Sequence, residues 1–283
     1  MLRITDISSL LPVYDYQMRL QVPYFIQTNF ENWQESFEND VDGEGRPLFR
    51  KLYGKAAYDG DTLIGFIQYG NTAFGFDDSG EISKDVSYSV IRSLYFDKGR
   101  EDAGKLLLEA AMNEFDTAGQ VYAFFHYFGM SCFARHGKLF EKFDWIKELL
   151  HQYGFVIEHE NVYYSVDVRD GVCSEVELIG HGVTAGGQQM FGFFLDRKQV
   201  GGCEVHYLPA RETVFLRWIY VNGEVQNQGI GSKCMTALKG YLHEKGMVRL
   251  DTDTALDNPR AQHYYEKNGF TREGITRSYY RIK

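Results

Sequence analysis

The chain has 283 residues, of which 44% are hydrophobic and 24% charged, with 5 prolines. This composition excludes disordered, collagen-like and low-complexity chains and predicts a globular protein of one or two domains. The net charge of −9 argues against a nucleic-acid partner, which requires a basic surface. No stretch approaches the roughly 18 consecutive apolar residues of a membrane span. Because the first residues also lack a signal-peptide core, we expect no membrane association and a cytoplasmic location.

The four cysteines indicate neither a disulfide framework nor a metal site. They are widely separated and include no C-x-x-C pair, and the eight histidines show no H-E-x-x-H spacing. We therefore predict buried reduced thiols and no bound metal. The cysteines are Cys132, Cys173, Cys203 and Cys234.

The first half of the chain is predicted to begin with a hairpin and then to alternate strands and helices. The run Asp59-Gly60-Asp61 predicts a tight turn. A strand is predicted over 91–96, and helical spacing of apolar residues predicts a helix over 106–115. We interpret the aromatic segment 122–128 as a core strand rather than a ligand platform.

The second half repeats this order at two constant offsets. Leu216–Val221 aligns with Ile91–Phe96 at an offset of 125, and Asn268–Phe270 aligns with Tyr153–Phe155 at an offset of 115. Each half ends in a predicted short closing strand. We therefore predict an α/β protein, with an α+β mixed sheet, made of two copies of one unit. The predicted domains are residues 1–165 and 166–283.

A glycine-containing loop joins the predicted strand at 216–221 to the next helix. It reads Gln226-Asn-Gln-Gly-Ile-Gly-Ser232. Glycines at such a junction remove side chains, so successive backbone N–H groups at a helix N-terminus can point at an anion such as pyrophosphate. The spacing is neither that of a Walker loop nor G-x-G-x-x-G, and taken alone a simple turn explains it as well.

A second motif follows this loop. Residues 248–252 predict a strand, and Asn258 is an expected N-cap because a proline follows it at the first helical position. The helix is predicted over 260–268 and ends at Gly269.

Together these two motifs resemble the GNAT superfamily of acyl-CoA-dependent N-acyltransferases. The Gln-x-x-Gly-x-Gly of residues 226–231 is similar to the family's acyl-CoA pyrophosphate loop. The pattern Asn258-x-x-Ala-x-x-x-Tyr265-Glu-Lys-x-Gly-Phe270 is similar to its second signature. The resemblance covers residues 190–283 well and the front half as a degenerate copy, so the whole chain looks like two tandem GNAT-like domains.

The resemblance implies acetyl-CoA as a cosubstrate and no metal. It also implies that the strand ending at Val221 separates from its neighbour and pairs through its backbone with pantetheine, with an N–H near Val221 stabilising the oxyanion. The implied acetyl-CoA-binding residues are Ile219, Tyr220, Val221, Gln226, Asn227, Gln228, Gly229, Ile230, Gly231, Ser232, Asn258, Ala261 and Tyr265.

Tyr265 is the implied acid that protonates the departing CoA thiolate. A phenol with a pKa of about 10 and a thiolate have similar basicity. The alternative is a core aromatic, since Ala261 lies one turn away on the same helix face. The adjacent Tyr264 points about 100 degrees away, and we interpret it as a packing residue.

The base that removes a proton from the amine is less clearly indicated. Glu204 is the residue we select, and it shares a strand face with His206. Glu212 lies just before the central strand. Each of the three carboxylate or imidazole groups could act directly or through a water, so the alternatives stay open.

The front half departs from the family pattern where acetyl-CoA would bind. An added carboxylate and two leucines oppose a pyrophosphate and remove the proton donor, so we predict that residues 1–165 keep the fold without the cofactor. This half also holds 25 acidic against 15 basic residues, which favours a cationic amine as substrate. The replacements are Glu101 for Gln226, Leu106 for Gly231 and Leu150 for Tyr265.

We therefore expect an N-acetyltransferase that moves an acetyl group from acetyl-CoA to a primary amine of a small molecule, for which a cationic molecule is one candidate. The amine attacks directly in a ternary complex. The alternative is a non-catalytic acyl-CoA-binding or regulatory module in which Tyr265 only packs. A longer acyl donor also stays open, and the sequence identifies neither the acceptor nor the oligomeric state.

Overall fold

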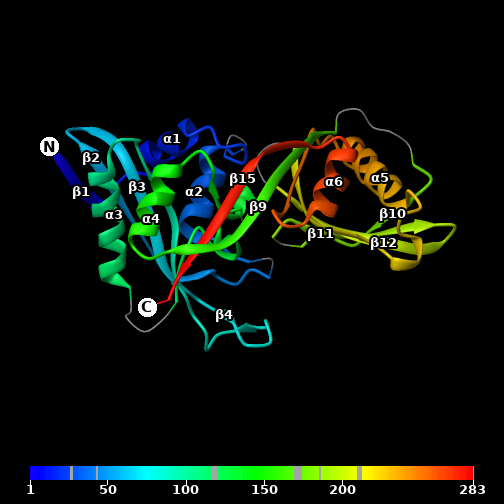
Figure 1. Ribbon diagram of the computed structural model, residues 1–283, viewed down its shortest axis with the longest axis horizontal. Helices are drawn as coiled ribbons and strands as arrows, with labels where there is room; N and C mark the ends of the chain where they lie inside the picture. Colours follow the sequence, from blue (N-terminus) through cyan, green and yellow to red (C-terminus); the bar gives the residue numbers. More distant parts are fainter. Residues whose placement is uncertain are drawn as a thin grey trace. The chain divides into compact units, whose positions relative to one another are not determined.

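The computed structural model describes residues 1–25, 28–42, 44–115, 120–134, 136–168, 174–184, 186–208 and 212–282. The chain divides into two compact units (Figure 1). Unit 1 contains Met1–Asp42, Arg46–Glu160 and the residues from Thr276 onward, and unit 2 consists mainly of Asn161–Ile275. The expected division lay between residues 165 and 166. The structure places the division after Glu160 and adds the end of the chain to unit 1.

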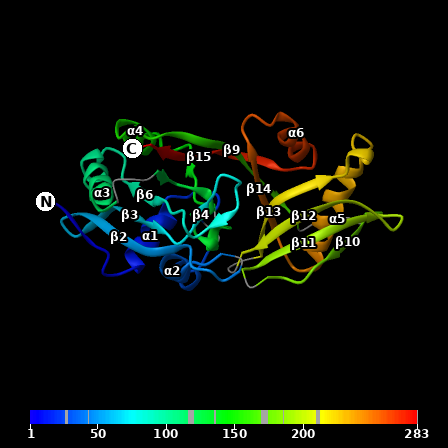
Figure 2. The same cartoon turned by 90° about the horizontal axis from the view of Figure 1, so that it is seen from below.

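Unit 1 is a mixed sheet with helices. Its strands follow the order β1-β2-β3-β6-β7-β15, with β8 also paired to β15, and β6–β7 is the parallel pair. Helix α3 packs against strands β3 and β6, α4 packs against β6, and α1 contacts β3 (Figure 2). The elements are β1 (Leu2–Asp6), α1 (Leu11–Arg19), α2 (Phe30–Asn39), β2 (Phe49–Asp59), β3 (Thr62–Thr72), β4 (Gly75–Phe76), β5 (Ile82–Ser83), β6 (Ser89–Phe96), α3 (Glu101–Glu114), β7 (Val121–Ala123), η1 (His126–Phe128), η2 (Ser131–Phe133), β8 (Leu139–Phe140), α4 (Asp144–Gln152) and the ends of β9 (Val156–Asp167) and β15 (Thr271–Arg281) that lie in this unit.

Unit 2 repeats the hairpin, strand, helix, strand, helix, strand order. Its strands follow the order β10-β11-β12-β13-β14-β9, and β13–β14 is the parallel pair. The elements, besides the remaining parts of β9 and β15, are β10 (Glu177–Gly180), β11 (Gln188–Leu195), β12 (Lys198–Tyr207), β13 (Thr213–Val221), η3 (Gly223–Val225), α5 (Ile230–Glu244), β14 (Arg249–Ala255) and α6 (Pro259–Lys267).

The local signals in the sequence form the turns and caps as expected. Gly60, with φ of +60°, lies in the turn between β2 and β3. Asn258 caps α6 by accepting a hydrogen bond of 3.1 Å from the N–H of Ala261. Gly246 and Gly269 both have positive φ just after the ends of α5 and α6. Such backbone conformations favour glycine and end a helix.

Helices α5 and α6 cover one face of the unit 2 sheet. Cys203, Val205 and Leu216 of the sheet are buried in one cluster with Met235 of α5 and Tyr265 of α6. Between residues 161 and 275, the described chain forms no other α-helix. The described part of unit 2 therefore supplies no helix to the opposite face, whereas unit 1 carries α1 and α2 ahead of its hairpin.

Two expectations about local structure were wrong. The aromatic segment 122–128 is largely buried as predicted, but its strand ends at Ala123, because Phe124 has φ of +55° and a short 3₁₀ helix follows. The closing strands β9 and β15 are long rather than short, and each contributes residues to both units.

The remaining expectations concern thiols and membrane spans. Cys132, Cys203 and Cys234 are free and buried as predicted. Cys173 lies outside the described residues. No helix in the described part of the chain is long and apolar enough to cross a membrane.

Candidate active site

Strands β13 and β14 separate in the middle of unit 2. Their parallel pairing runs from Thr213↔Arg249 to Leu216↔Thr252 and stops there, while β13 continues to Val221. On its other side β13 stays paired with β12 as far as Val221. In the described part of the chain, Arg217–Val221 therefore has no strand partner on the β14 side. The expected separation of these strands is present and leaves a backbone edge open to a ligand.

A β-bulge lies at the fork between the two strands. The register passes from Glu204↔Trp218 to Val205↔Leu216, which leaves Arg217 as the extra residue on β13. Arg217 Nη1 donates to Glu204 Oε1 at 2.8 Å, and Trp218 Nε1 donates to Glu204 Oε2 at 2.8 Å. Because a bulge redirects side chains, it brings the guanidinium of Arg217 and the indole of Trp218 onto the carboxylate of Glu204. This contact lies at the fork, the point where β13 and β14 separate.

The predicted pyrophosphate loop follows β13 and leads into α5. Asn227 has φ of +62° and Gly229, the N-cap of α5, has φ of +78°. Gln226 Nε2 donates to the carbonyl oxygen of Val221 at 2.8 Å, which fixes the start of the loop on the open strand. The loop thus ends at a helix N-terminus, where unpaired N–H groups and the helix dipole favour an anion.

Gly231 lies at a close contact between α5 and α6. A Cβ built on Gly231 would lie 3.1 Å from the ring of Tyr264. The hydroxyl of Tyr264 donates a hydrogen bond of 2.8 Å to the carbonyl oxygen of Gly231. Tyr264 therefore packs, as predicted, and also holds the first turn of α5.

The end of β13, the loop after it, the start of α5 and helix α6 line a pocket of about 620 Å³ in unit 2. Of the predicted acetyl-CoA-binding residues, all but Gln228 and Ile230 line it. The Gln228 side chain instead donates to the carbonyl of Glu224 at 3.0 Å, and Ile230 is buried in the core. The lining residues are Ile219, Tyr220, Val221, Gln226, Asn227, Gly229, Gly231, Ser232, Asn258, Arg260, Ala261, His263, Tyr264, Tyr265 and Lys267.

The sequence analysis missed three basic side chains in this lining. Arg260, His263 and Lys267 lie on one face of α6, at the i, i+3, i+7 spacing of a helix. Arg260 Nη2 donates to Gln226 Oε1 at 2.8 Å and so sits at the loop. No aspartate or glutamate is among the lining residues that the structure describes. Testing helical spacing for charged as well as apolar residues would have found this stripe.

Tyr265 is a buried residue in the lining of the pocket. It is 6% exposed and packs against the rings of Tyr164 and Phe270, with centroid distances of 5.7 and 5.3 Å. Burial raises the pKa of Tyr265 above its ordinary value, and a hydrogen bond with the Thr252 side chain acts in the opposite direction. The phenol is protonated at neutral pH, as a proton donor must be, and the raised pKa makes it a weaker acid than an ordinary tyrosine.

The three candidate bases lie at different places. Glu204, whose side chain is 14% exposed, is at the fork. His206 is buried further along β12 opposite Phe215, and Glu212 is exposed before β13. None of the three lines the pocket. Of the three, Glu204 is the one whose strand partner, Trp218, lies in the open part of β13.

Unit 1 differs at the equivalent of the loop. Helix α3 begins at Glu101, so residues 101–105 are helical where residues 226–230 of unit 2 form the loop and the first helical residue. Gly104 lies inside α3, where a Cβ would come within 2.5 Å of the Phe96 ring. Trp145, at the position of Arg260, donates through Nε1 to the carbonyl of Phe96 at 3.0 Å. Unit 1 thus has a helical turn where unit 2 has the loop. It also has the indole of Trp145 where unit 2 has the guanidinium of Arg260.

Unit 1 also has leucines in place of two residues that line the pocket of unit 2. Helix α4 matches α6 at an offset of 115 at both ends, so Leu150 takes the place of Tyr265, and it is buried. Leu106, at the place of Gly231, is 43% exposed. Neither leucine can donate a proton or leave room for a phosphate at these positions.

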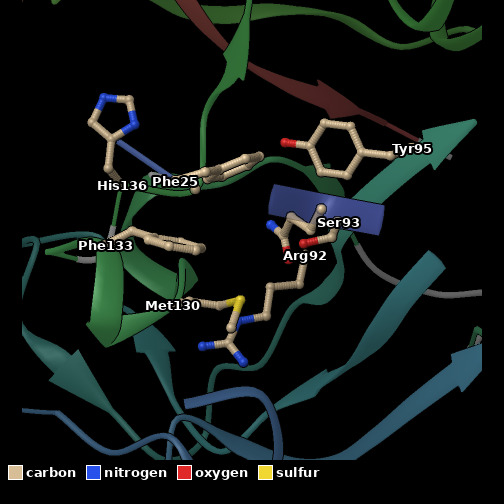
Figure 3. A pocket seen from close by; sticks show the side chains of 9 residues that line it. Phe25, Arg92, Ser93, Tyr95, Met130, Phe133 and His136 are labelled. Carbon is tan, nitrogen blue, oxygen red and sulfur yellow. The ribbon is translucent and has the colours of Figure 1, made fainter. Parts of the chain in front are cut away.

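A small cavity in unit 1 lies elsewhere, beside Arg92 and the rings of Phe25, Tyr95 and Phe133 (Figure 3). Its volume is about 10 Å³, which is no more than the space for one water molecule. It is too small to be a ligand site. Elsewhere too, the described residues bring no three His, Cys, Asp or Glu side chains into an arrangement that could hold a metal ion.

Comparison with known proteins gives one family. Residues 140–270, which include the loop, α5 and α6, match the model of the acetyltransferase (GNAT) family. No curated protein matches the sequence.

Several solved structures share the fold over nearly the whole chain. A tandem GNAT protein from the clavulanic acid biosynthesis pathway is 12% identical, with a TM-score of 0.55, over 99% of this chain and 98% of that one. A GCN5-related N-acetyltransferase from Sphaerobacter thermophilus is 8% identical, with a TM-score of 0.59, over 99% and 95%. A glucosamine N-acetyltransferase region of a fungal multi-domain enzyme is 10% identical, with a TM-score of 0.62, over 99% of this chain and 38% of that one. At these identities the likeness concerns the fold, which is that of tandem GNAT domains.

Proposed function

Because the chain contains a GNAT-family acetyltransferase domain within residues 140–270, we propose that it transfers an acetyl group from acetyl-CoA to a primary amine of a small molecule, directly in a ternary complex. The observation that carries this proposal is the open edge of β13 leading into a basic pocket. Arg217–Val221 has no strand partner on the β14 side among the described residues, and the described lining of the pocket beyond it contains basic side chains and no carboxylate. A thioester arm and a pyrophosphate match these two features.

The residues that would hold acetyl-CoA follow from the geometry. The loop from Gln226 to Gly229 and the N-terminus of α5 would receive the pyrophosphate, since Gly229 has no Cβ and a left-handed backbone. Arg260 and Lys267 would add positive charge from α6. The backbone of Ile219–Val221 would hydrogen-bond pantetheine.

Two side chains would move the protons. When acetyl-CoA is bound, it supplies the acyl group: the amine nitrogen bonds to the acetyl carbon and the carbon–sulfur bond breaks. Glu204 would accept the proton that the amine loses, directly or through a water, and Tyr265 would donate the proton that the departing thiolate gains. Tyr265 supports this role because it lines the pocket and a phenol is protonated at neutral pH.

Unit 1 is proposed to lack the cofactor. Helical residues replace the loop, Trp145 occupies the place of Arg260, and Leu150 replaces the proton donor. The acidic residues Glu101 and Asp102 in the first turn of α3 would also repel a pyrophosphate.

Calorimetric titration with acetyl-CoA, combined with a thiol-release assay over a panel of amines, tests the proposal. We expect one site per chain, a loss of binding in Gly229→Asp, and turnover with at least one amine. Tyr265→Phe should keep the affinity for acetyl-CoA and lose at least tenfold in kcat, in keeping with general acid catalysis.

The other outcomes are equally specific. Binding of acetyl-CoA with no turnover in wild type would favour the regulatory module in which Tyr265 only packs. Two sites per chain would contradict the degenerate unit 1, and no binding would remove the acetyltransferase proposal.

A further inference from the structure

We propose that the acceptor carries a carboxylate beside its primary amine, as a free amino acid does, and that Arg217 binds this carboxylate while Glu204 faces the amine. This inference rests on the proposed function and names the substrate class of the same site. It comes from comparing the two units of the chain with each other at the fork.

Both units place an arginine at the same strand irregularity. In unit 1 the register of β3 and β6 passes from Gln68↔Ser93 to Tyr69↔Ile91, which leaves Arg92 as the extra residue. In unit 2 the extra residue is Arg217, at the offset of 125 that relates the two strands. The two guanidinium groups therefore occupy equivalent places.

In unit 1 this arginine is buried, and all three of its side-chain nitrogens donate hydrogen bonds. Arg92 is 2% exposed and forms an ion pair with Asp40, the residue that follows α2. It also donates to the carbonyl oxygens of Ser36, Phe128 and Gly129, at 2.9, 3.0 and 3.1 Å. In Figure 3, Arg92 is seen with the side chains that line the small cavity beside it. In unit 1, a carboxylate from a helix end thus pairs with the arginine at the strand irregularity.

In unit 2 the equivalent arginine is exposed to solvent. The Arg217 side chain is 39% exposed, and its ion pair with Glu204 is its one hydrogen bond to the described residues. Nε and Nη2 therefore remain available for the parallel pair of bonds that a guanidinium makes with a carboxylate. The described residues of unit 2 form no counterpart of α2, so none of them holds the place that Asp40 takes in unit 1. A carboxylate brought by the acceptor would fill that place.

The position of this pair fits the acceptor rather than acetyl-CoA. Glu204 lies between Cys203 and Val205, which face α5 and α6, so its side chain is on the opposite face of the sheet. Trp218 and Arg217 bond to it on that face. The same stretch of β13 continues into the pocket-lining residues, so a molecule held at Glu204 and Arg217 meets the end of the open strand edge.

An amino acid matches both charges at this point. Its ammonium group is attracted to Glu204 and releases one proton to water before attack, and its carboxylate is attracted to Arg217. Glu204 accepts the second proton, which the nitrogen loses as it is acylated. The nitrogen then bonds to the acetyl carbon as described above, with the thiolate leaving. The rings of Trp218 and Tyr220, with centroids 5.8 Å apart, offer apolar surface to the rest of the acceptor.

The test compares matched acceptors on the full-length protein. Each amino acid of a panel is assayed beside the amine that lacks only its α-carboxylate, and kcat/KM is measured for both. We expect wild type to prefer the carboxylated member at least tenfold, as a hydrogen bond to a charged group implies. Arg217→Gln should reduce kcat/KM about tenfold or more for amino acids and less than about threefold for the matched amines. Arg217→Lys should restore part of the preference.

Two controls separate this role from a structural one. Arg197→Gln removes the same charge from the turn between β11 and β12 and should leave the preference unchanged. The affinity of Arg217→Gln for acetyl-CoA, measured by calorimetry, should stay within about twofold of wild type.

The other possible results separate a failure of this inference from a failure of the proposed function. Equal or better acetylation of the decarboxylated amines would overturn the inference while leaving the proposed function intact. Parallel losses with both members of each pair would make Arg217 a structural residue. If wild type binds no acetyl-CoA, the proposed function itself fails, and the inference falls with it.

Discussion

The hydroxyl of Tyr264 donates a hydrogen bond of 2.8 Å to the carbonyl oxygen of Gly231, across 33 residues of sequence. This bond ties α6 to the first turn of α5, next to the N-terminus that faces the pocket. Tyr264→Phe removes the bond and keeps the ring. Because a neutral hydrogen bond contributes about 0.5–1.5 kcal/mol, we expect the Kd for acetyl-CoA to rise about two- to tenfold in a calorimetric titration. Tyr265→Phe is the matched control, and it should lower kcat with little change in Kd. An unchanged Kd in Tyr264→Phe would show that the bond does not position α5.

A leucine at Gly231 would give unit 2 the residue that unit 1 carries at Leu106. The new Cβ would lie 3.1 Å from the Tyr264 ring, and the rest of the side chain would enter the pocket. We expect Gly231→Leu to lose at least tenfold in acetyl-CoA affinity. The reciprocal change Leu106→Gly should create no second site, because residues 101–105 are helical and cannot form the loop. Calorimetric stoichiometry checks both variants, and a second site in Leu106→Gly would show that the leucine alone had closed unit 1.

Asp251 makes the stability of unit 2 depend on pH. Its carboxylate accepts hydrogen bonds from Tyr163 at 2.8 Å and from Arg249 at 2.6 Å. Burial nevertheless raises the pKa of Asp251 from 3.8 to about 6. The folded state therefore holds this proton more tightly than the unfolded state, so the contribution of Asp251 to stability falls as pH rises from about 4 through 6.

Asp251→Asn removes this titration. Between pH 5 and pH 7.5, wild type should lose about 1–1.5 kcal/mol of unfolding free energy relative to the variant, as the shift of about two pKa units implies. Urea unfolding at the two pH values measures the difference. Asp257→Asn, a change at an exposed residue, should behave as wild type. A wild-type protein that gains stability over this interval relative to Asp251→Asn would contradict the assignment.

The helix ends of unit 2 were predictable from the sequence, because short motifs specify them. An N-cap followed by proline defines the start of α6, and glycines with positive φ follow the ends of α5 and α6. The ion pair at the fork was not predictable, because strand alternation places Arg217 and Trp218 on opposite faces. The bulge shifts this alternation by one residue and brings both onto Glu204.

The role of the last strand was also hidden from sequence. The segment around Tyr279 has the same apolar pattern as a closing strand of the second half, so its position in the chain suggested unit 2. Instead, β15 pairs with Val121–Ala123 and with Leu139 and Phe140 of unit 1. Hydrophobic pattern specifies that a segment is a strand, whereas the choice of a distant partner depends on the topology of the whole fold.

This strand gives the sharpest test of the architecture. Tyr279 is fully buried, pairs with Ala123 and lies 6.2 Å from the ring of His151, all in unit 1. Tyr279→Ala should cost about 3–5 kcal/mol, the usual loss when a large buried aromatic is truncated, and Tyr279→Phe should cost less than about 1 kcal/mol. Ile282→Ala, at a residue that is 70% exposed, is the neutral control.

Hydrogen exchange shows which unit is affected. In Tyr279→Ala, exchange should rise in β6 and β7, which are joined to this strand in unit 1, and stay near the wild-type rate in β11 and β12 of unit 2. The reason is that the strand end belongs to unit 1 and pairs with β7 there. Increased exchange confined to β11 and β12 would mean that the end of the chain stabilises unit 2, and the assignment of residues from Thr276 onward to unit 1 would be wrong.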